Sequence, residues 1–141
     1  MSGNLVLIDT SVWILALRKS PPPTVTVKDE VAHLLAENRV AIIPLIRLEL
    51  LGGTKSLNEF NRLKSRLSGL HQMPADEATW DTAIQLAFKL RQRGIIIPCT
   101  DILIASAAII NDCTLLHSDR HFDLMAENTH LDVRSFVSMV R

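Results

Sequence analysis

Two short stretches of the chain are apolar at every position, and both predict buried β-strands. Residues 5–8 read Leu-Val-Leu-Ile, and residues 40–43 read Val-Ala-Ile-Ile. Continuous apolar runs of this length are typical of parallel strands that are covered on both faces. Shorter or less regular apolar segments predict three further strands, at residues 70–73, 114–116 and 131–133.

The segments between these strands carry apolar residues at helical spacing. Positions 27, 31, 34 and 35, for example, form one apolar stripe on a helix. Proline suits the first turn of a helix and glycine its end, so a short helix is expected at 44–51, and Gly94 should end a long one. We expect helices at 12–17, 27–38, 44–51, 56–67, 75–93, 100–110 and 122–127. Thr10 or Ser11 should cap the first of these, and Thr100 the sixth.

Strands that alternate with helices predict a parallel sheet with helices on both faces. The expected fold class is α/β: a three-layer α/β/α sandwich with a central, mainly parallel sheet of four or five strands. The prolines at 21–23 predict a stiff surface loop, and residues 95–98 an irregular approach to the next helix. A chain of 141 residues suits one compact domain, so we expect a single domain over residues 1–141.

Three aspartates stand where strands end or helices begin. Asp9 ends the first strand and Asp119 follows the fourth, so both should reach the edge of the sheet at which parallel strands end and ligands bind. Asp101 falls in the first turn of its helix, where the helix dipole favours a negative charge. Two of the three have a simpler interpretation: a helix cap for Asp9, and an acid in the first helical turn for Asp101.

Glu49 is the more discriminating acid. Helical spacing places it on the same face as Leu45 and Leu48. An unpaired carboxylate on a buried apolar face is expensive, so Glu49 is either half exposed at the edge of the helix or held there for chemistry.

The four acids together indicate a bound divalent cation. Two like charges about 4 Å apart repel by roughly 1 kcal/mol in water and by about 4 kcal/mol at an intermediate dielectric. Converging carboxylates therefore either stay protonated or bind a hard cation, and Mg²⁺ or Mn²⁺ accepts such oxygen ligands. A cation of this kind polarises phosphoryl oxygens and activates water, so the pattern favours phosphate chemistry.

Polar neighbours of the acids could assist such a centre. Asp123 lies one helical turn after Asp119 and could supply an additional or outer ligand, or it could be a solvated helix charge. The hydroxyl groups of Thr10, Ser11 and Ser118 could orient water or a phosphate oxygen. Caps of helices or turns are the simpler interpretation of each of the three.

Composition narrows the class of protein further. Fifteen basic residues balance fifteen acidic ones, so any contact with nucleic acid must come from local clusters. Asp9 interrupts the first apolar run, unlike a signal peptide, and the longest later run would rise only about 14 Å as a helix, too little for a bilayer. Cys99 and Cys113 lack metal-ligand spacing and predict small buried side chains in a reducing cytoplasm.

Histidine and tryptophan positions carry less information. His117 and His121 flank Asp119 and could contact a substrate phosphate, but a polar surface or hydrogen-bonded histidine is the simpler interpretation of both. Trp13 and Trp80 fall at helical core spacing, which predicts packing residues.

Four ordered segments of the chain resemble the PIN-domain family. They are Leu-Val-Leu-Ile-Asp-Thr-Ser-Val-Trp at 5–13, Arg-Leu-Glu-Leu-Leu-Gly at 47–52, Arg-Gly-Ile-Ile-Ile-Pro-Cys-Thr-Asp-Ile-Leu-Ile-Ala at 93–105 and Leu-Leu-His-Ser-Asp-Arg-His-Phe-Asp at 115–123. Their order and spacing are similar to those of the small VapC-type toxins of bacterial and archaeal toxin–antitoxin pairs. The resemblance extends from residue 5 to residue 133, although residues 54–92 carry no family motif.

The resemblance implies an α/β/α fold and a magnesium- or manganese-dependent endoribonuclease. Asp123 falls where some members of the family carry a further acid, and Ser118 where many carry threonine or serine. Members of this type usually form homodimers, and a cognate antitoxin often inserts a peptide into the acidic pocket. The family's four acids match, in chain order, Asp9, Glu49, Asp101 and Asp119.

An acidic pocket repels a phosphodiester, so RNA binding needs flanking cations. The candidate clusters are Arg18-Lys19, Arg62-Lys64-Arg66 and Lys89-Arg91-Arg93, each of which can equally be a solvated helix end. Aromatic residues make up only 4% of the chain, which favours structured or looped RNA recognised by shape over stacking on single strands.

The sequence therefore predicts a metal-dependent endoribonuclease, the toxin of a type II toxin–antitoxin pair. Two alternatives remain open. One is a metal-dependent phosphatase or DNA nuclease, which would use the same acids. The other is a non-catalytic module with a PIN-like fold that binds RNA or protein.

Overall fold

The computed structural model describes residues 4–18 and 24–138, and a parallel sheet forms the centre of this part of the chain. Its five strands are β1 (Val6–Ile8), β2 (Val40–Ile42), β3 (His71–Gln72), β4 (Thr114–His117) and β5 (Val133–Ser135). They lie in the order β3-β2-β1-β4-β5, and every neighbouring pair is parallel. The predicted α/β sandwich is confirmed, with five strands in its sheet.

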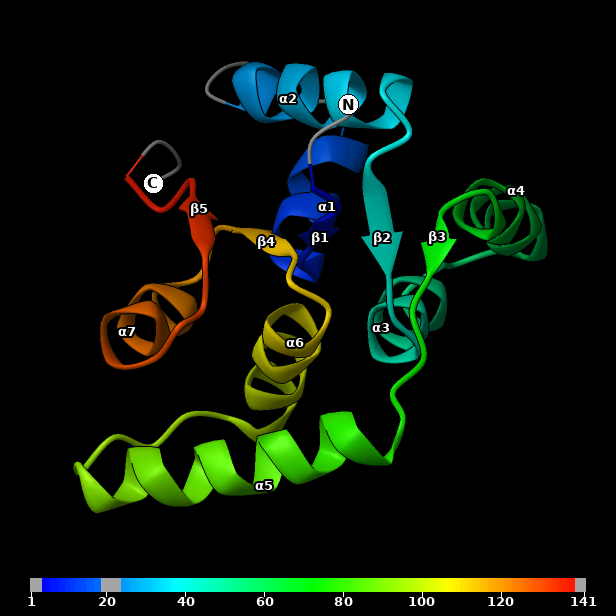
Figure 1. The fold of residues 1–141 in the computed structure, drawn as a ribbon. Coiled ribbons are helices and arrows are strands. Elements are labelled where there is room, and N and C mark those ends of the chain that lie inside the picture. The colour runs from blue at the N-terminus through cyan, green and yellow to red at the C-terminus, as the bar shows by residue number, and fades with distance from the viewer. Residues whose placement is uncertain (1–3, 19–23, 139–141) are drawn as a thin grey trace.

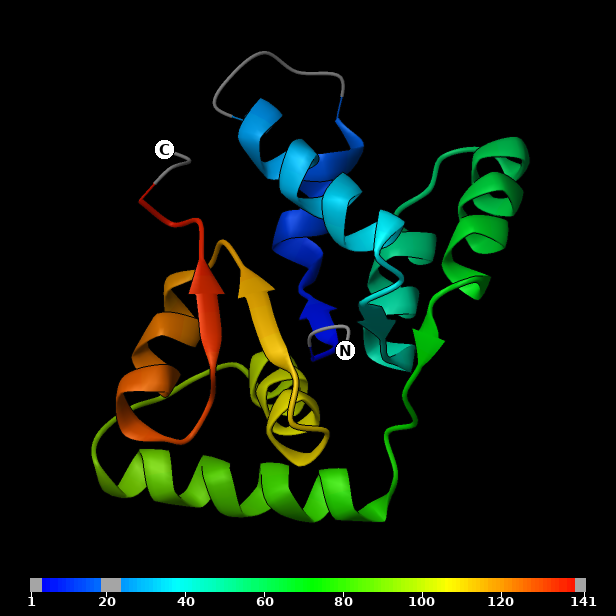
Figure 2. The same ribbon diagram turned by 45° about the horizontal axis from the view of Figure 1, so that its top comes forward.

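Seven helices connect these strands in the described residues. In both views α2 lies on one side of the sheet and α5 on the other, with α6 beside α5 (Figure 1, Figure 2). None of the described helices is both long and apolar enough to cross a bilayer. The helices are α1 (Thr10–Leu17), α2 (Thr24–Ala36), α3 (Pro44–Gly52), α4 (Leu57–Ser68), α5 (Glu77–Gln92), α6 (Cys99–Ile110) and α7 (Arg120–Asn128).

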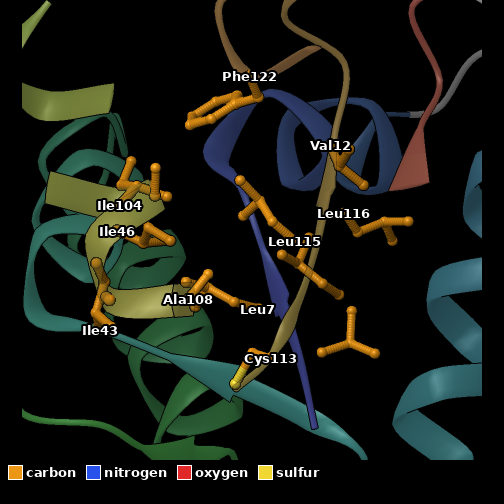
Figure 3. Packing of buried hydrophobic residues seen from close by; sticks show 14 of the residues in the cluster. Leu7, Val12, Ile43, Ile46, Ile104, Ala108, Cys113, Leu115, Leu116 and Phe122 are labelled. Atoms are coloured by element: carbon orange, nitrogen blue, oxygen red, sulfur yellow. The ribbon is translucent and has the colours of Figure 1, made fainter. Parts of the chain in front are cut away.

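The core lies where the sheet meets its covering helices. Every residue of β1 and β2 is buried, because helices cover both faces of these strands. Leu7 and Leu115 from adjacent strands belong to one hydrophobic cluster with Ile46 of α3 and Ile104 of α6 (Figure 3). Sheet and helices therefore share a single core, and the elements that carry the acids are fixed relative to one another.

The strand order reverses at β1, and this reversal determines where a ligand can bind. The chain moves outward from β1 to β2 and β3, and then returns to add β4 and β5 on the other side. In open parallel sheets a crevice forms beyond the carboxyl ends of the two strands at such a reversal. Ile8 at the end of β1 pairs with Leu116 of β4, so the residues that follow both strands enter the same crevice.

Both predicted hydroxyl caps are wrong. The N-cap of α1 is Asp9, whose carboxylate accepts a hydrogen bond from the backbone N–H of Ser11. The sixth helix begins after Pro98 without a side-chain cap, and Thr100 lies inside its first turn. Aspartate caps a helix at least as well as serine or threonine, so the local sequence Asp-Thr-Ser cannot select among its three candidates.

The last strand also differs from the prediction. It forms at Val133–Ser135 rather than at 131–133, because β4 pairs Leu115 with Val133 and His117 with Ser135. The predicted end of the long helix is confirmed: Gly94 has φ of 77°, a left-handed conformation that glycine adopts without strain. The predicted proline loop at 21–23 lies outside the described residues.

One tryptophan and one cysteine are not where their patterns predicted. Trp13 is buried as expected, but Trp80 is 51% exposed on α5. Cys113 is buried as expected, and burial raises the pKa of its thiol to about 11. Cys99 is exposed at the start of α6. The buried thiol is therefore unreactive near neutral pH, whereas the exposed one is accessible.

Candidate metal centre

The crevice between β1 and β4 collects acidic residues from several elements. Asp9 directly follows β1, Asp119 lies two residues after β4, and Asp101 stands in the first turn of α6. Parallel strands bring the first two to the same edge, and the packing of α6 against the sheet brings the third. The expected placement of Asp9 and Asp119 at the carboxyl edge follows directly from this topology.

Asp101 and Asp119 form a compact group with His121. One ligand atom from each of the three residues lies within 4.8 Å of the other two. Nδ1 of His121 is 2.8 Å from Oδ2 of Asp101 and 3.4 Å from Oδ1 of Asp119. The side chain of Asp101 is 17% exposed and that of Asp119 37%, so the group is sheltered but accessible to an ion from solvent.

Burial and neighbouring negative charges both act on Asp101. Burial raises the pKa of this carboxyl group above its usual value, and the negative charges of Asp119 and Asp9 raise it further. The hydrogen bond from His121 acts in the opposite direction. A divalent cation would relieve both the desolvation and the repulsion, because it supplies the positive charge that the three acids lack.

Asp9 is buried directly after β1, and Ser11 holds its carboxylate. Its Oδ2 accepts hydrogen bonds from the backbone N–H of Ser11 at 3.0 Å and from the Ser11 hydroxyl at 2.6 Å. The Ser11 hydroxyl accepts in turn from the backbone N–H of Ser118 at 3.0 Å. Ser11 thus joins the loops that follow β1 and β4. Asp9 caps α1, and its negative charge also helps to raise the pKa of Asp101.

Glu49 stands apart from this group. It is exposed, and its Oε1 accepts a hydrogen bond from the Thr10 hydroxyl at 2.7 Å. The face that Glu49 shares with Leu48 is not buried, since Leu48 is 68% exposed, so the exposed alternative for Glu49 is the one observed. The buried side of α3 carries Ile46 and Leu50 instead. Glu49 therefore costs little desolvation and is linked to the rim of the crevice through Thr10.

Asp123 faces His117 rather than the other acids. The two side chains approach to 3.0 Å between Nε2 and Oδ1, although the approach is not aligned as a hydrogen bond. The second carboxylate oxygen of Asp123 accepts from the Ser135 hydroxyl at 3.0 Å. In this arrangement Asp123 lies outside the compact group and braces the buried histidine.

His117 is fully buried, contrary to the expectation of a surface histidine, and it is hydrogen-bonded as expected. Its Nδ1 accepts from the backbone N–H of Asp119 at 3.1 Å, which places the ring proton of the neutral form on Nε2. Burial lowers the pKa of His117, and the charge of Asp123 only partly opposes this shift. The neutral ring thus orients the backbone beside Asp119.

His121 belongs to the compact group, although the sequence favoured a surface or hydrogen-bonded histidine at this position. Asp119 caps α7, and its Oδ1 accepts from the backbone N–H of His121 at 2.9 Å. A capping aspartate brings the second residue of its helix close to the carboxylate. A histidine two positions after a capping aspartate is therefore the sequence signal that could have placed His121 at this site.

Arg18, the described residue of the first predicted basic cluster, lies in the same groove as Glu49. Arg18 lines a groove of about 290 Å³ together with Thr10 and Glu49. Its predicted companion Lys19 lies outside the described residues. The cluster of Arg62, Lys64 and Arg66 is exposed on α4, consistent with a solvated helix face.

The third basic cluster lies far from the acids. Lys89 and Arg93 line a separate pocket, and Arg93 donates hydrogen bonds to Asn128 at the last position of α7. Asp119 caps the opposite end of the same helix, and nine residues of helix rise about 13 Å. A phosphate bound between Lys89 and Arg93 would therefore not lie at the acidic group.

The donor set fits a divalent metal ion. Two carboxylates and an imidazole converge, and the negative charge of Asp9 acts on one of the two carboxylates, that of Asp101. Oxygen-rich sets of this kind suit Mg²⁺ and Mn²⁺, and an added nitrogen is tolerated better by Mn²⁺ than by Mg²⁺.

A parallel α/β domain with acids at its strand reversal is the architecture of a PIN domain. The sequence model of the PIN domain family matches residues 6–128, and the chain belongs to this family. Ribonuclease VapC11 of Mycobacterium tuberculosis is 30% identical over 136 residues, which cover 94% of this chain and 99% of that protein.

Solved structures share the fold. One is VapBC2 from Rickettsia felis bound to a DNA fragment from their promoter, with a TM-score of 0.76 and 24% identity, over 93% of this chain and 98% of that one. Another is VapBC-5 from Mycobacterium tuberculosis, a member of the VapBC family of toxin–antitoxin systems. Its TM-score is 0.61 and its identity 19%, over 94% of this chain and 98% of that one.

Proposed function

We propose that this protein is a metal-dependent endoribonuclease, the toxin of a type II toxin–antitoxin pair. The observation that carries the proposal is the meeting of Asp101 and Asp119 with His121 at the strand reversal, where Asp9 directly follows the neighbouring strand β1. Membership of the PIN family supports it. So does the name of the 30% identical relative, a ribonuclease that this chain matches over almost its whole length.

In this proposal Asp9, Asp101 and Asp119 hold the ion, and Glu49 contributes from the rim. A bound Mg²⁺ or Mn²⁺ polarises the phosphoryl group and makes water a better nucleophile. The protein supplies rigidity: Ser11 fixes Asp9, and helix capping fixes Asp119. It also supplies a cation for binding, because Arg18 lines a groove with Thr10 and Glu49 and can attract a phosphodiester there.

The proposal is tested by comparing three substrates with the purified protein: a structured RNA, single-stranded DNA and a small phosphate monoester. We expect cleavage of the RNA alone, dependent on Mg²⁺ or Mn²⁺, abolished by a chelator and restored by excess metal. Hydrolysis of the monoester would indicate a phosphatase, and cleavage of DNA a DNA nuclease. Binding of RNA without any turnover would indicate the non-catalytic module.

We further propose that two copies pair through α5. Trp80, Ile84 and Phe88 follow one another at helical spacing and are 51%, 65% and 64% exposed. With Cys99 and Leu103 of α6, Trp80 and Ile84 also border an apolar groove of about 130 Å³. Exposed apolar side chains in a row, two of them aromatic, are characteristic of protein interfaces, which supports a homodimer at this face.

Replacing Phe88 with glutamate is expected to convert a dimer into a monomer, because the charge would have to be buried in the interface. Sedimentation equilibrium measures the mass, and circular dichroism checks the fold. Leu57→Glu is the matched control, since Leu57 is 74% exposed on α4, outside the proposed face. A wild-type protein that is monomeric at every concentration, or a Phe88→Glu variant that remains dimeric, would reject this interface.

The remaining parts of the proposal concern partner and location. We propose a cognate antitoxin as protein partner, supported by the toxin–antitoxin assembly named among the solved relatives. We propose that the chain acts as one PIN-like domain in the cytoplasm. Its single shared core supports one domain, and the exposed free thiol of Cys99 is compatible with a reducing compartment.

A further inference from the structure

We propose that His121 is a direct nitrogen ligand of the metal ion and makes the site selective for Mn²⁺ over Mg²⁺. The inference rests on the proposed function, because it concerns the ion of the same site. It adds a ligand that the acidic motifs do not contain.

The distances from the imidazole of His121 to the two carboxylates match the spacing between ligands around one metal ion. Two donors that occupy adjacent octahedral positions about 2.1 Å from one ion lie about 3.0 Å apart. Nδ1 of His121 is 2.8 Å from the nearer oxygen of Asp101 and 3.4 Å from that of Asp119, values on either side of this spacing. An ion held by both carboxylates would therefore have Nδ1 within bonding reach, without a large movement of the chain.

The backbone holds the histidine in this position. The backbone N–H of His121 donates to Oδ1 of Asp119, so the two proposed ligands are held close together at the start of α7. The ring is 43% exposed, which leaves solvent and an incoming ion access to it. A histidine that served only to fix Asp101 would need one hydrogen bond. This one lies between two carboxylates instead.

A nitrogen donor changes which metal the site prefers. Mg²⁺ favours oxygen ligands and retains its waters. Mn²⁺ also favours oxygen, but it is a first-row transition metal, at the low end of the series whose members bind mixed nitrogen and oxygen sites. The site as built should therefore bind Mn²⁺ more tightly than Mg²⁺. The difference should come from His121, since the three aspartates are common to both ions.

Calorimetric titration of the wild-type protein and His121→Asn with MnCl₂ and with MgCl₂ tests this prediction. We expect the asparagine to weaken Mn²⁺ binding by about 10-fold or more and to change Mg²⁺ binding much less. His130→Asn is the control, since His130 is exposed beyond the far end of α7. His121→Asp, which supplies oxygen in place of nitrogen, should restore binding with the preference moved toward Mg²⁺.

A spectroscopic measurement shows whether His121 binds the metal ion directly or only lies near it. Electron spin echo modulation of bound Mn²⁺ should show nitrogen coupling in the wild-type protein and none in His121→Asn. Equal weakening of both ions would mean that His121 only positions Asp101, and tighter binding in His121→Asn would mean that it competes with the ion. Either result, or the absence of nitrogen coupling, overturns the inference while RNA cleavage and the proposed function stand. A wild-type protein that binds Mg²⁺ but not Mn²⁺ would overturn the inference alone, and failure to bind either ion would overturn both.

Discussion

Replacing Asp9 with asparagine should abolish RNA cleavage and leave the fold intact. Asparagine caps helices about as well as aspartate, so the hydrogen bonds from Ser11 and the start of α1 should survive. What disappears is one of the negative charges that act on Asp101 and that would hold the metal ion. Replacing groups that only support a ligand costs 10- to 100-fold in activity, so loss of a ligand should cost about 100-fold or more.

The measurement is the initial rate of RNA cleavage in saturating Mg²⁺, with urea unfolding as the check on stability. Asp76→Asn is a matched control. Asp76 caps α5 in the same way, accepting from the backbone N–H and the hydroxyl of Thr79, both at 3.0 Å. We expect that variant to retain full activity, and both variants to unfold within about 1 kcal/mol of the wild-type protein. Full activity of Asp9→Asn would remove Asp9 from the site.

The parts of the fold that could be predicted from sequence are those in which the segment's own residues allow only one structure. A run such as residues 5–8, apolar at every position, has no exposed face to offer, so it becomes a buried strand wherever it lies in the sheet. Pro44 at the start of α3 and Gly94 after α5 act through their own backbone preferences. These elements formed within one or two residues of the predicted bounds.

Other features depend on packing between distant elements. Helix α3 is apolar on several sides, so spacing alone could not show that Ile46 and Leu50, rather than Leu48, face the core. Helix α5 likewise carries two apolar stripes. The one with Leu86 and Leu90 is buried, and the one with Trp80 is exposed.

The candidate site, like the fold, could be predicted from the sequence only in part. Asp9 and Asp119 follow neighbouring parallel strands, so their meeting is a consequence of topology. Where a side chain points from its helix is not. Asp101 and His121 meet because of how α6 and α7 pack, and Asp123 points toward His117 although it stands one turn from Asp119. Sequence spacing fixes the helix but not the rotamer that chooses among these partners.

Replacing Phe122 with alanine should cause the largest loss of stability outside the sheet. The ring is fully buried at the start of α7 (Figure 3). Its centroid lies 5.2 Å from that of the His117 ring. Large-to-small substitutions of buried phenylalanine cost about 3–5 kcal/mol, because transfer free energy and packing are lost together. Leu124→Ala on the same helix is the control. Leu124 is 37% exposed, so its truncation should cost about 1 kcal/mol.

Phe122→Ala should also reduce RNA cleavage under conditions in which the variant is still folded. Phe122 packs against the buried ring whose Nδ1 accepts from the backbone N–H of Asp119, so a cavity there loosens the loop that carries one of the acids. Urea unfolding gives the free-energy difference, and cleavage is measured well below the midpoint of unfolding. Phe122→Leu provides a milder cavity if the alanine variant fails to fold, because a total stability of about 5–15 kcal/mol leaves little margin. A Phe122→Ala protein as stable as Leu124→Ala would show that α7 does not anchor the site through this contact.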